Sequence, residues 1–248
     1  MLQISRKFLA LPFNEVFFYE LKSESRYVPK VINYTHRLKP SRQLQKQQTI
    51  HIDLRKNEQL LFAEMSSTIK NVIQNIKAND WAVSIIQQPS NDQIIEFQRF
   101  YNVYAAQNKI QKINRYALQT LILLRDKNGL IITKVTDDNN TLCYRVYAVD
   151  GQNVMSLYTT GQSLQEENEA FKNAYYYLCW ENMKRFQRLG YKVYDFGDLR
   201  DISLLKDLNE NFGGNVVNVY SGYITKSRFS NILLQINSLT GRTYKLKK

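Results

Sequence analysis

Residues 190–198 read GYKVYDFGD, and FGG at 212–214 and VVNVY at 216–220 follow them. The apolar and aromatic run within the first stretch predicts a buried strand that ends in a turn. The paired glycines predict the end of a short helix, because glycine readily adopts the conformation that terminates helices. The valine-rich segment after them predicts a second strand that returns to the sheet. We therefore expect strand, turn, short helix and strand in this part of the chain.

The segments before this stretch change from a helical to a strand period and back. Residues 130–135, 142–149 and 153–158 alternate as strands, and Asp-Gly at 150–151 is a hairpin signal. A long helical pattern then covers 166–189, with glutamates in its first turn and lysine and arginines in its last, as the helix dipole favours. The order predicted is a three-strand meander, a long helix, a strand, a short helix and a final strand.

The N-terminal part alternates in a similar way. We expect a strand over 49–54, a helix from Asn57 to about Asn79, a strand over 81–86 and helices over 94–104 and 114–125, with short strands and turns in 1–48. These patterns predict an α/β protein. We expect an N-terminal half, 1–110, and a C-terminal half, 111–248.

Length and composition indicate a folded protein. The chain has 248 residues and 44% hydrophobic content, enough for a substantial core in one large domain or two small ones. The apolar run from Phe8 to Phe13 is short and contains Pro12, so neither a signal peptide nor a membrane span is expected. Cytoplasmic localisation is the resulting expectation.

Cysteines and histidines are sparse. Cys143 and Cys179 lie in apolar sequence without metal-binding spacing, so we interpret them as buried free thiols. His36 and His51 lack a spaced cluster of further ligands. A zinc site or a serine–histidine nucleophile is therefore not expected, which excludes most hydrolase chemistry, and no metal or permanent cofactor is predicted.

The net charge of +12 is concentrated at the two ends of the chain. Residues 1–48 contain nine Lys or Arg against three Asp or Glu, and residues 224–248 contain six against none, whereas 49–223 contains 19 of each. A nucleic-acid-binding surface would require the two basic ends to meet on one face. A basic rim for a phosphorylated small molecule and a merely solvated surface are the alternatives.

The order of elements and the sequence motifs within residues 180–222 resemble those of the Fem-type transferases of the GNAT acyltransferase superfamily. The resemblance rests on Trp180, on Leu189-Gly190, on Tyr194-Asp195-Phe196-Gly197, on Phe212-Gly213-Gly214 and on Tyr220, and weaker similarity reaches back to Ile52-Asp53-Leu54. It implies a GNAT-like mixed sheet with splayed central strands and an N-terminal half that is a diverged or partial companion unit.

Within this group, the chain looks most like the nucleotide-sugar branch. That resemblance implies transfer of an acyl group, acetyl or hydroxybutanoyl-like, from acyl-CoA to the amine of a dTDP-linked aminodideoxy sugar. The product would serve the synthesis of surface polysaccharides such as the O-antigen of lipopolysaccharide. Direct attack by the amine, without a covalent enzyme intermediate, is the implied mechanism, and a homodimer is a possible assembly.

The sequence departs from the family in three places. Fem-type enzymes that use aminoacyl-tRNA usually have Phe-Lys where this chain has Leu208 and Asn209, and a basic first helix where it has Lys70, Gln74 and Asn75. Both departures argue against a tRNA donor. The pyrophosphate-binding loop of ordinary GNAT enzymes is absent from 159–163.

The fold resemblance also implies where acyl-CoA would bind. Two splayed strands would leave backbone groups for the pantetheine arm, and amides near Leu157, Tyr158 and Thr159 would hold the developing oxyanion. The phosphates would lie on the amides of Gly161, Gln162 and Ser163 at the start of the long helix. Asn209 and Asn211 are candidates for hydrogen bonds to pantetheine, with helix capping as the alternative role.

Asp195 and Asp198 are the candidate catalytic and substrate-binding carboxylates, because they follow the end of a core strand. Either would accept the amine proton or orient the sugar; the alternative for Asp195 is that it caps the following turn. Tyr176 and Trp180 are candidates for stacking on the substrate, although helical spacing also favours core positions for them. Two other functions stay open: an aminoacyl-tRNA-dependent transferase acting on a cell-envelope precursor, and a non-catalytic nucleic-acid-binding module.

Overall fold

The computed structural model describes residues 1–8, 11–18, 31–76, 81–138, 140–160, 169–199 and 202–225. Contacts between Cα atoms divide the chain into two compact units. Met1–Gln48 and Val217–Lys248 form the first, which we call the terminal unit. Thr49–Val216 forms the second, the central unit.

The terminal unit is built from strands. In its sheet β1 pairs antiparallel with β2, β2 parallel with β3, and β3 antiparallel with β10. A small core of Val16, Tyr34 and Leu44 and a buried ion pair between Arg6 and Glu15, 3.1 Å apart, lie within this unit. The strands are β1 (Leu2–Phe8), β2 (Leu11–Phe17), β3 (Val31–Arg37) and β10 (Asn215–Thr225), the last of which begins in the central unit.

The central unit has six strands in the order β4-β9-β8-β7-β6-β5. The pair β8–β9 is parallel and the other pairs are antiparallel, so the sheet is mixed. The strands are β4 (Gln45–Asp53, in this unit from Thr49), β5 (Ala82–Ile86), β6 (Leu130–Asp137), β7 (Asn140–Val149), β8 (Asn153–Thr159) and β9 (Val193–Asp195). The predicted α/β class with a mixed sheet and the predicted meander are confirmed.

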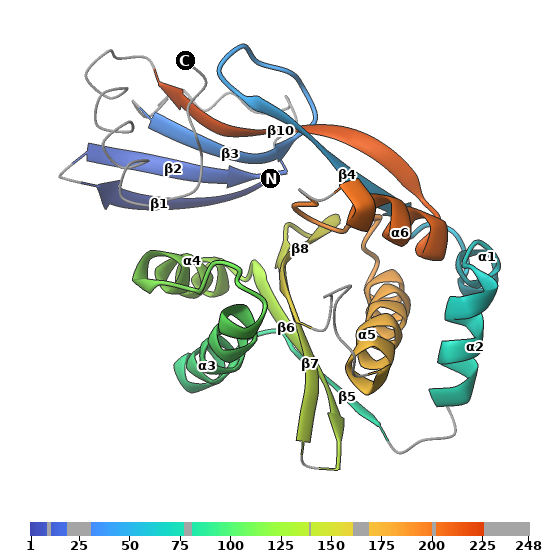
Figure 1. The fold of residues 1–248 in the computed structure, drawn as a ribbon. Helices are drawn as coiled ribbons and strands as arrows, with labels where there is room; N and C mark the ends of the chain where they lie inside the picture. The colour runs from blue at the N-terminus through green and yellow to red at the C-terminus, as the bar shows by residue number, and fades with distance from the viewer. Residues whose placement is uncertain are drawn as a thin grey trace. The chain divides into compact units, whose positions relative to one another are not determined.

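Helices cover both faces of this sheet (Figure 1). On one face α5 packs against β6, β7 and α2, and on the other α4 packs against β6 and α3. The central unit's helices are α1 (Glu58–Ala63), α2 (Ser67–Ile76), α3 (Asn91–Gln107), α4 (Arg115–Asp126), α5 (Glu169–Arg188) and α6 (Ile202–Phe212). The core between the sheet and α5 contains both cysteines as buried free thiols, which confirms that interpretation.

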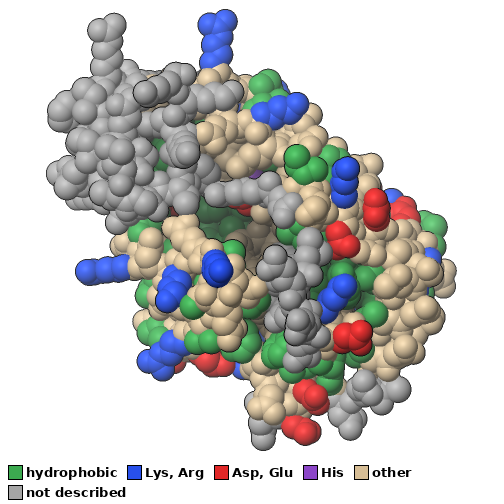
Figure 2. All heavy atoms as spheres, in the orientation of Figure 1, with side chains coloured by type: hydrophobic (Ala, Val, Ile, Leu, Met, Phe, Trp, Pro, Cys, Tyr) green, Lys and Arg blue, Asp and Glu red, His purple; other side chains and the backbone are tan. Residues whose placement is uncertain are grey.

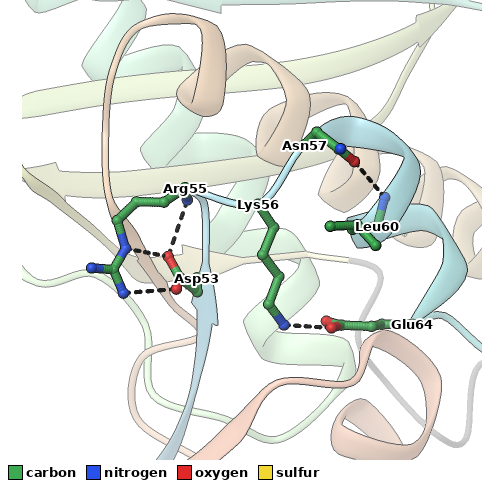
Figure 3. Close-up of polar contacts among 6 residues, drawn as sticks. All are labelled: Asp53, Arg55, Lys56, Asn57, Leu60 and Glu64. Carbon is green, nitrogen blue, oxygen red and sulfur yellow. Dashed lines mark hydrogen bonds and ion pairs between the residues drawn. The ribbon is translucent and has the colours of Figure 1, made fainter.

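The single helix expected from Asn57 is divided into α1 and α2. Asn57 caps α1 by accepting the amide of Leu60, and the chain then leaves the helix after Glu64 (Figure 3). Ser66 starts α2, because its hydroxyl accepts the amide of Ile69. The continuous apolar period across both helices concealed this break.

The turn between β4 and α1 carries its own ion pairs (Figure 3). Arg55 donates two side-chain hydrogen bonds, each 2.7 Å long, to the two carboxylate oxygens of Asp53. This guanidinium lowers the pKa of Asp53. Lys56 pairs with Glu64 at the other end of α1.

The sequence predicts a division into an N-terminal half, 1–110, that is a diverged or partial companion unit and a C-terminal GNAT-like half, 111–248. This division stays a prediction. The compact units follow other boundaries, because β4 pairs with β9 and α2 packs against α5. Elements from both halves of the sequence therefore contribute to the core of the central unit.

Candidate active site

The two parallel strands of the central unit separate after three residues. β8 pairs with β9 only through Asn153–Met155 and Val193–Asp195. β8 continues from Ser156 to Thr159 without pairing to β9, and Leu157, Tyr158 and Thr159 are half-buried. The pairing of β8 with β9 thus ends at the place where the sequence predicts splayed strands.

A β-bulge lies in the same part of β8. Val146 pairs with Tyr158 and Tyr147 pairs with Ser156, so Leu157 is the extra residue opposite β7. A bulge interrupts the regular alternation of hydrogen bonds and turns backbone groups away from the ladder. The residues predicted to hold the oxyanion therefore lie at an irregular, partly exposed point of the strand.

Gly197, two residues after the end of β9, lies directly against the backbone of β8. Its φ is +85°, which favours glycine, and a Cβ built on it would lie 2.0 Å from the carbonyl oxygen of Ser156. The glycine of the Phe196-Gly197 motif is therefore required for steric reasons, because any side chain at this position would overlap Ser156. The chain after β9 thus still lies against Ser156, one residue beyond the last β8–β9 pair.

Asp195 ends β9 and is 2% exposed. Its Oδ1 accepts hydrogen bonds from the amide of Gly197, at 2.8 Å, and from the hydroxyl of Thr49, at 2.6 Å. The bond to the amide two residues ahead is the turn-capping arrangement that was the alternative for this residue. A catalytic role for Asp195 stays a prediction, and its geometry is that of a fixed, buried carboxylate.

His51, which the sequence analysis set aside, lies beside Asp195. The two residues are direct partners in the antiparallel pair β4–β9, so their side chains share one face of the sheet. Nε2 of His51 is 3.4 Å from Oδ2 of Asp195 and makes no hydrogen bond. The signal that could have found this pair is the strand TIHID, in which Thr49, His51 and Asp53 alternate on one face.

Arg145 of β7, also unpredicted, is 1% exposed. Its Nη1 donates to Sγ of Cys179 at 2.5 Å and its Nη2 to Oγ of Ser156 at 3.3 Å. The rings of Tyr147, Tyr175, Tyr194 and Phe196 surround the guanidinium, with centroids between 5.0 and 5.9 Å from its carbon. A positive charge is therefore buried next to Ser156, the first residue of β8 beyond the pairing with β9.

This charge has no ion-pair partner among the described side chains, and its Nε makes no hydrogen bond. Burial raises the pKa of the Cys179 thiol, and the nearby guanidinium opposes that rise. We take the thiol as neutral, because burial is the larger effect. Burying a guanidinium without a carboxylate costs stability, so a role beyond packing is worth testing.

Asp198 is exposed, and the site described above does not use it. Tyr176 and Trp180 are 5% and 2% exposed and belong to the core, where Tyr176 packs on Phe212 and Trp180 on Phe62. Their burial agrees with the core interpretation, and substrate contact by either stays a prediction. Gly161, Gln162 and Ser163 lie outside the described residues.

The two asparagines of α6 differ. Asn211 accepts a hydrogen bond from Ser66 and donates one to Asp207, so it joins the end of α6 to the start of α2. Asn209 has a buried side-chain oxygen without a partner. Leu208 is fully buried in the core.

Neither a cluster of metal ligands nor a membrane-spanning helix is found within the described residues. Three or more His, Cys, Asp or Glu side chains come together nowhere in this part of the chain as a metal site would require. Among the described helices, none combines the length and the apolar character needed to cross a bilayer.

Comparison with solved structures places this architecture among GNAT-like folds. The chain is similar to the crystal structure of FemX, with a TM-score of 0.62 and 10% identity over 94% of this chain and 85% of that one. It is also similar to the C-terminal DUF2156 domain of a putative lysylphosphatidylglycerol synthetase from Agrobacterium fabrum, with a TM-score of 0.55 and 8% identity over 84% and 72%.

A conserved protein of unknown function from Bacteroides thetaiotaomicron gives a TM-score of 0.51 at 10% identity, and the match covers 74% of this chain. It covers 63% of the Bacteroides protein, which is less than two thirds of its length. No protein-family model matches the chain, and no curated protein matches its sequence. At these identities the similarity establishes the fold, which is the predicted GNAT-like mixed α/β fold.

Proposed function

We propose that this protein is an N-acyltransferase that moves an acyl group from acyl-CoA to the amine of a nucleotide-linked amino sugar. The observation that carries the proposal is the separation of β8 from β9 after Met155, with the bulge at Leu157 beside it. A slot between parallel strands offers backbone groups to an amide-containing chain such as pantetheine, much as an added strand would pair.

The bulge supports a position for the reacting carbonyl. A backbone amide turned out of the ladder near Leu157 would donate to the oxyanion that forms when the amine attacks. In other enzymes, loss of one such donor costs about 3 to 4 kcal/mol of transition-state stabilisation. Arg145 would add a positive charge behind Ser156, next to the same point of the strand.

The acceptor follows from the sequence resemblance, which favours a dTDP-linked aminodideoxy sugar. Asp195 and Asp198 are the proposed acidic groups on the acceptor side. The phosphate-binding role of 161–163 remains part of the proposal, although these residues lie outside the described structure. The mechanism proposed is direct attack without an enzyme-bound acyl group.

A thiol-release assay tests this function. Purified protein is incubated with acetyl-CoA or 3-hydroxybutanoyl-CoA and one of several dTDP-aminosugars, and free CoA and the amide product are measured. We expect CoA release that depends on the sugar and equals amide formation. Absence of product with every pair would reject the proposal.

A second candidate is an aminoacyl-tRNA-dependent transferase. It is favoured by the similarity to FemX, and the Agrobacterium protein's name also points to aminoacyl transfer. Leu208 and Asn209 argue against it, because the usual lysine is absent. Transfer of a labelled amino acid from charged tRNA, with a steep decrease in tRNA binding as salt rises, would favour this candidate over the first.

The charge distribution gives less support to a non-catalytic nucleic-acid-binding module. Residues 49–223 contain 19 basic and 19 acidic residues, and Figure 2 shows side chains of both signs on one face of the described residues. A nucleic-acid surface would be expected to gather basic side chains on one face. Tight tRNA binding without any acyl transfer would favour the nucleic-acid-binding module over both transferases.

A further inference from the structure

We propose that His51 is the general base that takes the proton from the acceptor amine, and that Asp195 is the residue that positions it. The inference rests on the proposed acyl transfer. It changes the role expected for Asp195, from a group that contacts the amine to one that acts through the imidazole.

His51 lies beside Asp195 in the sheet, in a row that continues to β8. His51 pairs with Asp195 across β4–β9, and Asp195 pairs with Met155 across β9–β8. The three residues form one row across three neighbouring strands. The next residue of β8, Ser156, is the one at which the strands separate. His51 is therefore two strands away from β8, in the row just before the point where the pairing of β8 with β9 ends.

Hydrogen bonds hold the carboxylate of Asp195 in a fixed position, as a positioning role requires. Its Oδ1 accepts hydrogen bonds from the amide of Gly197 and the hydroxyl of Thr49, while its Oδ2 faces Nε2 of His51. Thr49 and His51 are two residues apart on β4, so both reach the same carboxylate from one strand face. Asp195 is 2% exposed, and a carboxylate so enclosed has little access to a substrate amine.

The imidazole itself is accessible. The His51 side chain is 21% exposed, in contrast to 3% for that of Asp195. Nε2 is buried, and no hydrogen bond joins Nδ1 to any side chain or backbone group in the described ranges. When Nε2 carries the proton and faces Asp195, Nδ1 has its lone pair free to accept a proton. The distance of 3.4 Å is compatible with a contact that shortens when substrate binds.

The nitrogen of the acceptor attacks the thioester carbonyl carbon, a C–N bond forms, and the carbonyl electron pair moves to oxygen. Nδ1 of His51 takes the proton from nitrogen, and Asp195 stabilises the resulting imidazolium. The intermediate collapses, the C–S bond breaks, and CoA leaves as a thiolate that takes up a proton from the imidazolium or from solvent. The products are the amide and free CoA.

Removal of the imidazole tests the proposal. His51→Ala should lower kcat by about 100-fold or more, with a smaller change in KM, because a general base acts in the transition state. Added imidazole should restore turnover in a saturable manner. Such rescue separates a proton acceptor from a residue that only supports the fold, because a structural defect does not respond to a small base.

Asp195→Asn tests the positioning role. This variant should lose part of the turnover, and imidazole should not restore it, because His51 would still occupy its place. Asp150→Asn is the matched control: Asp150 also closes a turn, by accepting the amides of Gln152 and Asn153, and lies at a hairpin between β7 and β8. It should keep wild-type turnover. Circular dichroism and thermal unfolding confirm that each variant is folded, and His51→Gln replaces the alanine variant if that one is not.

The outcomes separate this proposal from the proposed function. If the wild type makes no amide from any donor and acceptor, the proposed function is rejected and the base assignment with it. If the wild type is active and His51→Ala keeps its rate, only the base assignment is overturned. If a folded His51→Ala or His51→Gln variant is inactive and imidazole does not restore turnover, His51 has another role and the proposal is again overturned.

Discussion

Gly214 lies against the backbone of His51. A Cβ built on Gly214 would be 2.8 Å from the His51 carbonyl oxygen and 2.5 Å from the end of the Ile52 side chain. The FGG motif thus ends α6 and also lets the chain pass β4 next to the proposed base. The second glycine of the motif has a steric function that links a sequence signature to the candidate site.

Gly214→Ala should therefore destabilise the protein and disturb the site. The alanine would meet a positive φ of +95° and overlap β4, so we expect a loss of about 2 to 4 kcal/mol in the free energy of unfolding. Urea unfolding measures it. Gly190→Ala is the control, since its φ is +84° but a Cβ there would meet nothing within 4 Å, and about 1 kcal/mol is expected. Equal losses in both variants would contradict the steric argument.

Gly197→Ala tests the separation of the strands. A Cβ at Gly197 would overlap the Ser156 carbonyl, so either the turn or β8 must move. We expect a loss of about 3 kcal/mol or more in the free energy of unfolding, and loss of transfer activity. Gly151→Ala has a similar φ, +86°, with open space around it, and should cost about 1 kcal/mol without affecting activity. A Gly197→Ala protein with wild-type stability would show that the close approach is unimportant.

The order of elements in the C-terminal part could be read from the sequence, because turn and helix-end signals separate its segments. Asp150-Gly151 marks the hairpin, and Gly190 and Gly213-Gly214 mark two helix ends with positive φ. The pairing of distant strands could not be read. Thr49 and Asp195 are 146 positions apart, and only the sheet brings them within 2.6 Å.

Arg145 was missed for a different reason. Its strand contains apolar and aromatic residues on both sides of it, and a single arginine in such a run gives no signal of whether it is buried or exposed. The break between α1 and α2 was missed because Leu61, Met65 and Ile69 keep a helical period through it. In both cases the local pattern was regular, and the tertiary packing decided the outcome.

Arg145→Met tests whether the buried guanidinium is required for stability. Methionine fills similar space without a charge to desolvate, so the free energy of unfolding should change by about 1 kcal/mol or less. Arg145→Ala should lose about 3 kcal/mol or more, because it leaves a cavity among four aromatic rings. Lower transfer activity in a stable Arg145→Met protein would indicate a functional charge. Equal destabilisation of both variants would instead show that the guanidinium contacts hold the core.

The thiols should be inert in the native protein. Cys143 and Cys179 are both fully buried, and burial raises the pKa of Cys179, which leaves little reactive thiolate. A colorimetric thiol reagent should therefore detect no rapid reaction under native conditions and two thiols after denaturation. Rapid reaction of one thiol in the folded protein would show that the guanidinium of Arg145 stabilises a thiolate at Cys179.

Alkaline pH should unfold the protein through its buried tyrosines. Burial raises the pKa of Tyr147 and of Tyr176 from 10.0 to about 12. The folded state then holds these protons more tightly than the unfolded chain does, so their contribution to stability is complete below about pH 10 and declines as the pH approaches about 12. Urea midpoints measured from about pH 8 to about pH 12 should decrease over that window, and tyrosinate absorbance should rise together with unfolding. If all tyrosines ionise near their ordinary pKa while circular dichroism stays native, the packing described for the α5 core is wrong.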